Sequence, residues 1–195
     1  MGLDQRIGKR FLHAGAGFGG SCFPKDLKAI VAFARAHHYT PRMLEATLKV
    51  NRDQAIHVVR LLKNLLRTLK GKRIAVLGLS FKPGTDDLRE APSIKIIRQL
   101  LKEGANVVGY DPVAIENAKK MLGRRIEYAA SARSCLDRAD AALLVTEWEE
   151  FDELSPTDFK DRMSQPVLID ARRIYDPATY GSILVYSAVG LGKST

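Results

Sequence analysis

Residues 73–112 read RIAVLGLSFKPGTDDLREAPSIKIIRQLLKEGANVVGYDP, and this stretch contains the clearest structural pattern in the chain. The apolar run Arg73–Leu79 is typical of a strand that is buried on both faces. A helical pattern covers Pro92–Glu103 and ends at Gly104, and Asn106–Asp111 predicts a second strand. A strand, a helix and a second strand in succession indicate a βαβ unit with parallel strands.

The alternation of strands and helices continues along the chain and predicts a doubly wound parallel sheet, a Rossmann-like α/β fold, over residues 71–195. Gly71 marks the start of this region, because the sequence pattern changes there to alternating strands and helices. Further strands are expected at Ala141–Thr146, Val167–Asp170 and Ile183–Ser187. Helical patterns cover Val113–Leu122, Arg133–Arg138 and part of Phe151–Met163.

The preceding segment, residues 1–70, has a different character and predicts a loop followed by two helices. Its beginning is glycine-rich and irregular, and Pro24 then suits the first turn of a helix that should end near His38. A longer helix is expected from about Pro41 to Leu69. Its length exceeds that of most globular helices, so we expect a spine through which two copies of the chain form a homodimer.

The composition is that of a globular protein with a basic surface. Of 195 residues, 46% are hydrophobic and 27% are charged, and the net charge is +9. The basic residues are dispersed, without interleaved aromatic side chains that stack on bases, so the charge favours an anionic metabolite over nucleic acid. No stretch is apolar enough for a membrane span or a signal peptide, and we expect a soluble cytoplasmic protein. Cys22 and Cys135 match no metal-ligand spacing, so no metal site is predicted.

Two glycine motifs resemble nucleotide-binding signatures but lack their context. Gly15–Gly20 (GAGFGG) fits G-x-G-x-x-G, which needs a strand before it and a helix directly after it. Here the preceding segment is short, and Cys22 and Pro24 interrupt the segment after the motif, so we interpret the glycines as positions where the backbone passes close to a ligand. Gly190–Thr195 (GLGKST) resembles the end of a P-loop, but Ser187 stands where that motif requires glycine.

The loop after the first predicted strand, Gly78–Glu90, is a candidate for ligand binding. Loops at the carboxyl ends of parallel strands hold the ligands of open α/β sheets. This loop contains Lys82 and Arg89, whose side chains are able to bind phosphate or carboxylate, although a solvated loop would also carry such residues.

Cys22 is the candidate nucleophile. It precedes a predicted helix whose first turn contains Lys25 and Asp26, and a thiol beside a helix N-terminus and a lysine favours the reactive thiolate. Asp26 could orient or deprotonate a water molecule. The alternative is a small buried apolar cysteine, which is how we interpret Cys135.

Three segments resemble, in order and spacing, the UDP-glucose/GDP-mannose dehydrogenase family. RIGKRFLHAGAGFGGSCFPKD (Arg6–Asp26) is similar to the family's catalytic-cysteine segment, and Leu77–Pro112 to the start of its C-terminal nucleotide-sugar-binding domain. IDARRIYDP (Ile169–Pro177) is similar to its late arginine motif. The resemblance implies that the C6 alcohol of a nucleotide sugar is oxidised to a carboxylate, with NAD as cofactor. SCFPKD looks closer to members that act on UDP-glucose.

The resemblance also implies roles for individual residues. Cys22 would form a thiohemiacetal and then a thioester, and Asp26 would assist hydrolysis of the thioester. The residues implied to contact the nucleotide sugar are His13, Ala14, Gly15, Ala16, Gly17, Phe18, Gly19, Phe81, Lys82 and Arg172, with Arg6 donated across a dimer interface. Arg173 stands where the family often has asparagine. The residues implied to contact NAD are Cys22, Phe23, Pro24, Lys25 and Arg89.

Members of the family begin with an NAD-binding Rossmann domain that has no counterpart in this sequence. We therefore expect either that the chain is a truncated reading frame or that a partner supplies this domain, and we expect that the chain alone does not reduce NAD. Two hypotheses result: part of a dehydrogenase that is catalytic when completed, or a non-catalytic module that binds a nucleotide sugar and dimerises. Nucleic-acid binding, a third hypothesis, rests on charge alone.

Overall fold

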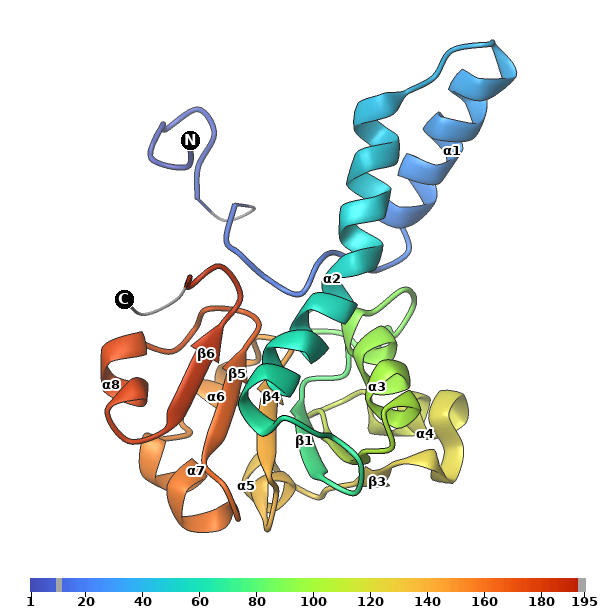
Figure 1. The fold of residues 1–195 in the computed structure, drawn as a ribbon. Coiled ribbons are helices and arrows are strands. Elements are labelled where there is room, and N and C mark those ends of the chain that lie inside the picture. The colour runs from blue at the N-terminus through green and yellow to red at the C-terminus, as the bar shows by residue number, and fades with distance from the viewer. Residues whose placement is uncertain (10–11, 193–195) are drawn as a thin grey trace.

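The chain folds around a six-stranded sheet in a computed structural model that describes residues 1–9 and 12–192 (Figure 1). The strands are β1 (Arg73–Leu77), β2 (Asn106–Tyr110), β3 (Glu127–Tyr128), β4 (Ala141–Leu144), β5 (Val167–Asp170) and β6 (Val185–Ala188). All of them are parallel, in the order β3-β2-β1-β4-β5-β6. The chain winds outward from β1 to one side and then from β4 to the other, which confirms the predicted doubly wound fold.

Helices cover both faces of the sheet. The helices described are α1 (Phe23–Ala36), α2 (Arg42–Leu66), α3 (Pro92–Lys102), α4 (Ile115–Leu122), α5 (Ala132–Leu136), α6 (Glu149–Asp152), α7 (Pro156–Arg162) and α8 (Pro177–Gly181), and all except α1, which packs on α2, contribute to the layers on these faces. Ile74 and Val76 of β1 face a hydrophobic layer that includes α2, α3 and α4, whereas Ala75 and Leu77 face a layer that includes α5 to α8. Because alternate residues of a strand point to opposite faces, this double coverage explains the unbroken apolar run of β1.

Local signals fix where several helices begin. Pro24 lies in the first turn of α1 and Pro92 in that of α3, where the missing N–H of proline needs no partner. At the start of α7, Ser155 and Asp158 form a capping box in which each side chain accepts the backbone N–H of the other residue.

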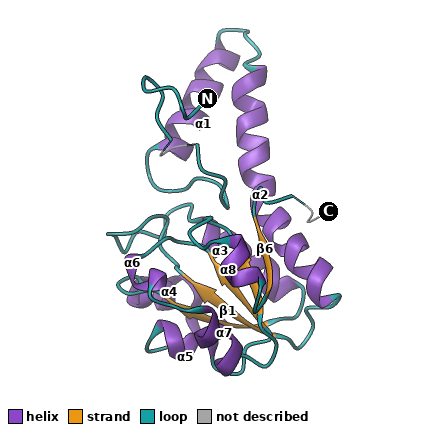
Figure 2. Ribbon diagram, turned by 90° about the vertical axis from the view of Figure 1, so that its left-hand side faces the viewer, coloured by secondary structure: helices purple, strands orange, loops and turns teal. Residues whose placement is uncertain are grey.

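Helices α1 and α2 form a hairpin whose tip projects from the sheet (Figures 1 and 2). The second half of α2 lies on the sheet, where Val58 and Leu62 are buried in the same layer as α3. The projecting part instead exposes large apolar side chains, with Phe33 67% and Met43 81% exposed. Arg67, whose φ is +63°, follows α2 and ends it earlier than the sequence predicts.

Three short elements, β3, α8 and the 3₁₀ helix η1 (Gly123–Arg125), are not predicted from the sequence. They are too short for a periodic pattern to reveal them; β3, for example, pairs with β2 through Glu127 and Tyr128 alone. The strand expected at Ile183–Ser187 is present as β6, but it lies slightly later in the sequence, at Val185–Ala188. Its last residue, Ala188, pairs with Asp170 of β5. In residues 1–9 and 12–192, no helix combines the length and apolar character that crossing a membrane would require.

Candidate functional site

The carboxyl ends of β1 and β4 form the switch point of the sheet, where neighbouring strands lead the chain in opposite directions. In doubly wound folds, ligands bind in the crevice at this point. The loop after β1 (residues 78–91) and the segment after β4 (residues 145–148) flank it, and the loop after β5 lies beside them because β5 pairs with β4.

The N-terminal glycine segment, residues 15–20, crosses the same end of the sheet. The Ala16 N–H donates to the Ala171 carbonyl, just after β5, at 3.1 Å. The Gly20 N–H donates to the Arg89 carbonyl, in the loop after β1, at 2.8 Å. The glycine segment is therefore tied to two of the three loops that surround the switch point.

Helix α2 holds the other side of the glycine segment. Asn51 forms two hydrogen bonds with the backbone of Phe18: its Oδ1 accepts the N–H at 2.8 Å and its Nδ2 donates to the carbonyl at 3.0 Å. Gln54 Nε2 donates to the Gly15 carbonyl at 2.8 Å. A Cβ on Gly17 would lie 2.5 Å from Asn51 Oδ1, so this contact requires glycine.

Two further glycines also lie against the protein. A Cβ on Gly19 would lie 2.6 Å from the Glu90 carbonyl oxygen, and one on Gly20 would lie 2.7 Å from the Phe81 ring. Gly20 also has a φ of +84°, which side-chain-bearing residues rarely adopt. The sequence predicts that these glycines admit a ligand; at these positions, the space that a side chain would need is taken by the protein itself.

Cys22 lies at the N-cap position of α1, and its side chain is exposed, as expected for a reactive thiol. Its carbonyl accepts the Asp26 N–H at 2.9 Å, in the first helical turn. The Asp26 carboxylate is exposed and lies 3.5 Å from Lys25 Nζ. The exposed ring of Phe23 makes an edge contact with Phe18, with 6.2 Å between the ring centroids.

A hollow of about 430 Å³ adjoins the start of α1. Its lining includes three residues that the resemblance assigns to NAD, namely Pro24, Lys25 and Arg89. Lys28 lines it as well, so its wall carries several cationic side chains. The Arg89 guanidinium is paired with the Asp87 carboxylate at 2.7 Å, which lowers the pKa of Asp87.

Glu90, on the wall of the same hollow, ties α1 to α3. Its two carboxylate oxygens lie 2.8 Å from Lys28 Nζ and 2.9 Å from Lys95 Nζ. The hydrogen bonds from these ammonium groups lower the pKa of Glu90 to about 2. Glu90 also has a φ of +53°, and its carbonyl contacts Gly19, so it lies where three segments meet.

The loop after β1 is fixed by Asp111, a buried residue that follows β2. Its Oδ2 accepts the backbone N–H groups of Leu79 at 2.8 Å and of Ser80 at 3.0 Å. Lys82, farther along this loop, is exposed, and its Nζ lies 5.4 Å from the centroid of the Phe81 ring.

The loop after β5 is fixed in the same way by Asp170, which is completely buried. Its Oδ1 accepts the backbone N–H groups of Arg172 and Arg173 at 2.8 Å and 2.7 Å. Its Oδ2 accepts the Tyr175 N–H at 3.0 Å and the Tyr186 hydroxyl at 3.1 Å. Burial, with the nearby Asp170 carboxylate, raises the pKa of Tyr186.

The Arg172 side chain lies under the glycine segment. Its Nε donates to the Val145 carbonyl at 2.6 Å, and a Cβ on Gly15 would lie 3.3 Å from its Nη1. The structure therefore brings together Gly15 and Arg172, two residues that the resemblance assigns to the nucleotide sugar although they are distant in sequence.

Other predicted residues lie outside this cluster. Arg6 is exposed, and its guanidinium pairs with the Asp4 carboxylate at 2.8 Å. His13 and Ala14 are exposed and line a separate hollow of about 480 Å³, together with Arg173, whose φ is +59°. A contribution from Arg6 to a neighbouring copy of the chain stays a prediction.

No strand lies next to the GAGFGG motif in the described residues around it. Residues 12–22 contain no strand, whereas residues 10 and 11, directly before them, lie outside the described residues. Residues 193–195, the end of the GLGKST motif, also lie outside them. In the described part of the chain, no group of three or more His, Cys, Asp or Glu side chains could hold a metal ion.

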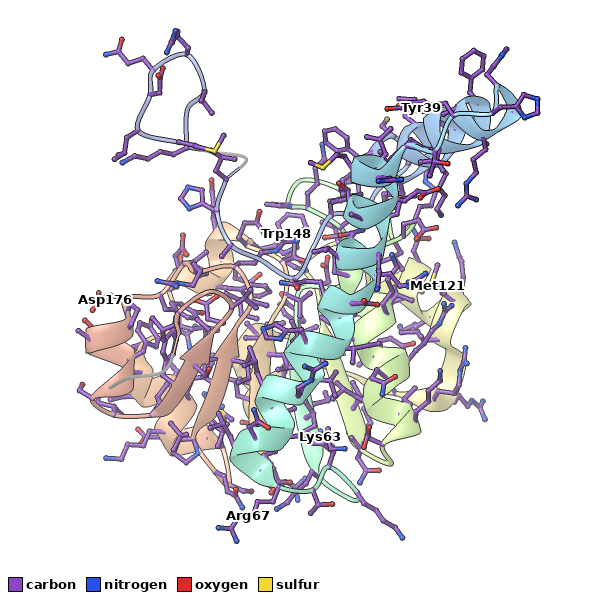
Figure 3. The ribbon with its side chains drawn as sticks, turned by 45° about the horizontal axis from the view of Figure 1, so that its top comes forward. Tyr39, Lys63, Arg67, Met121, Trp148 and Asp176 are labelled. Carbon is purple, nitrogen blue, oxygen red and sulfur yellow. The ribbon has the colours of Figure 1, made fainter. Side chains whose placement is uncertain are left out.

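Sequence reasoning missed the buried carboxylates Asp111 and Asp170 and the segment Thr146–Trp148. Asp111 directly follows the apolar strand β2 and Asp170 is the last residue of the apolar strand β5, and this repeated placement was a usable signal. Figure 3 places Trp148 at the end of the sheet that the N-terminal segment crosses, away from Lys63 near the other end of α2. No periodic pattern marks residues 146–148, because their importance depends on the order of the strands.

Family models match two parts of the chain. The central domain of the UDP-glucose/GDP-mannose dehydrogenase family matches residues 1–53, and the UDP binding domain of the same family matches residues 75–177.

The chain is also similar to curated proteins and to solved structures. It is 53% identical over 174 residues to UDP-glucose 6-dehydrogenase AglM of Haloferax volcanii, covering 89% of this chain and 40% of that protein. It is 43% identical over 175 residues to UDP-glucose 6-dehydrogenase TuaD of Bacillus subtilis, covering 90% of this chain and 38% of that protein. A UDP-glucose dehydrogenase structure from Pyrobaculum islandicum superposes with a TM-score of 0.85 at 35% identity, over 95% of this chain and 41% of that chain. The chain thus spans roughly two fifths of the length of these relatives.

Proposed function

Because this chain belongs to the UDP-glucose/GDP-mannose dehydrogenase family, we propose that it is the thiol-bearing and UDP-sugar-binding part of an NAD-dependent enzyme that oxidises UDP-glucose to UDP-glucuronate. One observation carries the proposal: the glycine segment is packed between α2 and the loops after β1 and β5. This packing joins Cys22, at the end of the segment, to two loops that carry the cationic side chains Lys82 and Arg172.

The switch point supplies the groups that a nucleoside diphosphate sugar requires. Arg172 is a guanidinium with N–H donors in a planar fork, which suits phosphate oxygens, and Lys82 adds an exposed ammonium group from the loop after β1. The backbone of residues 13–19 would line the ligand from above, and Phe81 would border it. The relatives named as UDP-glucose 6-dehydrogenases support UDP-glucose as the substrate.

The chemistry assigned to Cys22 fits its exposed position at a helix N-terminus. After the alcohol at C6 has lost a hydride and a proton to become an aldehyde, the Cys22 thiolate adds to the aldehyde carbon and forms a thiohemiacetal. Loss of a second hydride and a proton gives a thioester. Water, whose proton Asp26 accepts, hydrolyses the thioester and releases the thiolate and the carboxylate product. The covalent bond holds the aldehyde at the site between the two oxidations.

NAD, when bound, accepts the hydride in each oxidation. The hollow beside α1 fits part of such a ligand, because Lys25, Lys28 and Arg89 give its wall positive charge and the α1 N-terminus adjoins it. These residues would hold the cofactor's anionic portion next to Cys22. The remainder of the cofactor site would come from an NAD-binding domain outside the 195 residues of this sequence.

A homodimer is part of the proposal. The projecting hairpin exposes Phe33, Tyr39, Met43 and Val50, each at least 65% exposed, and clustered apolar surface of this kind favours association. Dimerisation through α2 would also allow Arg6 of one copy to reach the substrate of the other. Light scattering over a concentration series tests this, and a monomer at every concentration would contradict it.

A non-catalytic module that binds a nucleotide sugar and dimerises is the second candidate. The observation that favours it is that GAGFGG packs against the protein and that residues 12–14 before it form no strand. The described residues therefore contain no dinucleotide fingerprint of their own.

Two experiments separate these functions. Calorimetry of the 195-residue chain should show tighter binding of UDP-glucose than of GDP-mannose or duplex DNA, and tighter binding of DNA would overturn both candidates. Adding the separately expressed N-terminal domain of the Haloferax volcanii relative should then allow NADH formation from UDP-glucose, and Cys22→Ser should abolish the full conversion. Sugar binding without any NADH under these conditions would favour the non-catalytic module.

A further inference from the structure

Three consecutive residues after β4, Thr146, Glu147 and Trp148, contact three different parts of the switch point. Thr146 Oγ1 donates to the Ser80 carbonyl at 2.5 Å, and Trp148 Nε1 donates to Asp111 Oδ2 at 3.1 Å. Both contacts support the loop after β1. Glu147, between them, faces the loop after β5, where its Oε2 lies 3.0 Å from Arg172 Nε.

The geometry at Arg172 distinguishes the two edges of its guanidinium. Nε carries one hydrogen, and this hydrogen is donated to the Val145 carbonyl at 2.6 Å. Glu147 Oε2 is therefore held by its charge beside Nε, and this buried oxygen has no hydrogen-bond partner in the described part of the chain. Nη1 lies toward Gly15 and the glycine segment.

The exposed fractions of the Arg172 and Glu147 side chains fit a fixed ion pair that leaves one edge of the guanidinium open. The Arg172 side chain is only 17% exposed, so its charge is largely removed from water and needs a nearby anion. Glu147 is the carboxylate that supplies it. A planar guanidinium held along its Nε edge keeps its terminal N–H groups aligned for bidentate contact with an oxyanion.

We propose that Glu147 is a positioning residue that fixes the Arg172 guanidinium by its Nε edge and leaves the terminal N–H groups directed at a diphosphate. This inference rests on the proposed function, because it takes the nucleotide sugar as the ligand. Charge alone predicts the opposite effect of removing Glu147: a neutral residue at this position would repel a diphosphate less and so strengthen binding. The two effects have opposite signs, which makes the role of Glu147 measurable.

The test compares Glu147→Gln, Glu147→Asp and the matched control Glu149→Gln in the 195-residue chain. Glu149 is exposed and lies two residues away, so its substitution makes the same change in charge without touching Arg172. With UDP as the probe in calorimetry, we expect Glu147→Gln to weaken binding about tenfold, Glu147→Asp to retain most of the affinity, and Glu149→Gln to behave as the unsubstituted chain. Equal or tighter binding by Glu147→Gln would overturn the proposal.

A second measurement needs no ligand. Hydrogen exchange at Arg172 Nε, followed by nitrogen-15 NMR, should become faster in Glu147→Gln and stay unchanged in Glu149→Gln. Unchanged exchange in Glu147→Gln would overturn the positioning role even if UDP binds. If instead the unsubstituted chain does not bind UDP but exchange responds to Glu147→Gln, the proposed ligand is wrong and the positioning of Arg172 stands.

Discussion

The loops after β1 and β5 and the segment that carries Cys22 meet at the same end of the sheet, but different forces hold them. Each loop is anchored by a buried carboxylate, Asp111 or Asp170, that accepts several backbone N–H groups. The Cys22 segment instead depends on close packing of glycines and on exposed ion pairs such as Lys28–Glu90. The diphosphate side of the proposed site is thus built into the sheet, whereas the thiol side lies at the surface, where a cofactor domain or a second copy would cover it.

The two cysteines give the largest expected contrast between these regions. Cys22 is exposed before α1, whereas Cys135 is completely buried in α5, where loss of solvation raises its pKa to about 12. Alkylation with iodoacetamide near neutral pH should therefore be roughly a thousandfold faster at Cys22, because only an accessible thiolate reacts. Peptide mapping over time measures both rates, and the unfolded chain, in which the two should react alike, is the control. Faster labelling of Cys135 would contradict the assignment of Cys22 as the nucleophile.

Removing the charge of a buried anchor should have the next largest effect. Asp170→Asn places an amide N–H₂ where the carboxylate accepts hydrogen bonds from four groups, so we expect the free energy of unfolding to fall by about 3 kcal/mol. Affinity for UDP should fall with it, since Arg172 would lose its backbone anchor. Asp26→Asn, at the exposed thiol side, should change stability by less than about 0.5 kcal/mol. Urea denaturation followed by the fluorescence of Trp148, the single tryptophan, measures both; equal losses would show that the two regions are held alike.

The packing of the glycine segment predicts a smaller loss. Gly20→Ala combines an unfavourable φ of +84° with a clash against Phe81, so we expect a loss of about 2 kcal/mol in unfolding free energy. Gly84→Ala is the matched control, because Gly84 has a φ of +74° but no atom near the added Cβ. It should cost about 1 kcal/mol, the conformational part alone. Similar losses for both variants would mean that the Phe81 contact contributes nothing to holding the Cys22 segment.

Sequence reasoning recovered the sheet because its evidence is local. The strands β1, β2 and β5 are apolar runs that end near glycine or aspartate, β4 is an apolar run that follows Asp140, and double burial keeps those runs uninterrupted. The edge elements were harder: Glu127 in β3 and Val185 in β6 are exposed, so these strands are less clearly apolar than the central ones. The end of α2 was misplaced because Arg67 adopts a positive φ, which an arginine in the sequence does not predict.

Sequence could identify a candidate site residue where a motif marks it. It could not identify a residue that acts through a neighbouring side chain. Cys22 lies at a helix start as its flanking residues indicate, and Arg172 lies at a strand end. Glu147 contacts Arg172 only because β4 and β5 are adjacent. The sequences of these two strands and their loops do not indicate that they are neighbours in the sheet. Sequence cannot distinguish a ligand from Phe81 or Asn51 as the close neighbour of a glycine, and contact between the glycine backbone and a ligand stays a prediction.

Glu90 gives the smallest expected effect among these tests of how the segment that carries Cys22 is held. Its pKa of about 2 lies below the ordinary value of 4.5, so the folded chain keeps this carboxylate charged at a pH where the unfolded chain protonates it. The stabilisation is therefore complete above about pH 4.5 and is lost as the pH falls toward 2. Because the side chain is 40% exposed, screening by solvent reduces the expected contribution to about 1 kcal/mol.

Glu90→Gln should remove this contribution and flatten that part of the dependence of stability on pH. Glu116→Gln breaks an exposed pair with Lys119 on α4, far from the hollow in sequence, and should leave the pH dependence unchanged. Denaturation at a series of acidic pH values measures both variants against the unsubstituted chain. Identical pH profiles for all three chains would mean that Lys28 and Lys95 do not clamp α1 to α3 through Glu90. The glycine contacts would then be the interactions that hold Cys22 beside the switch point.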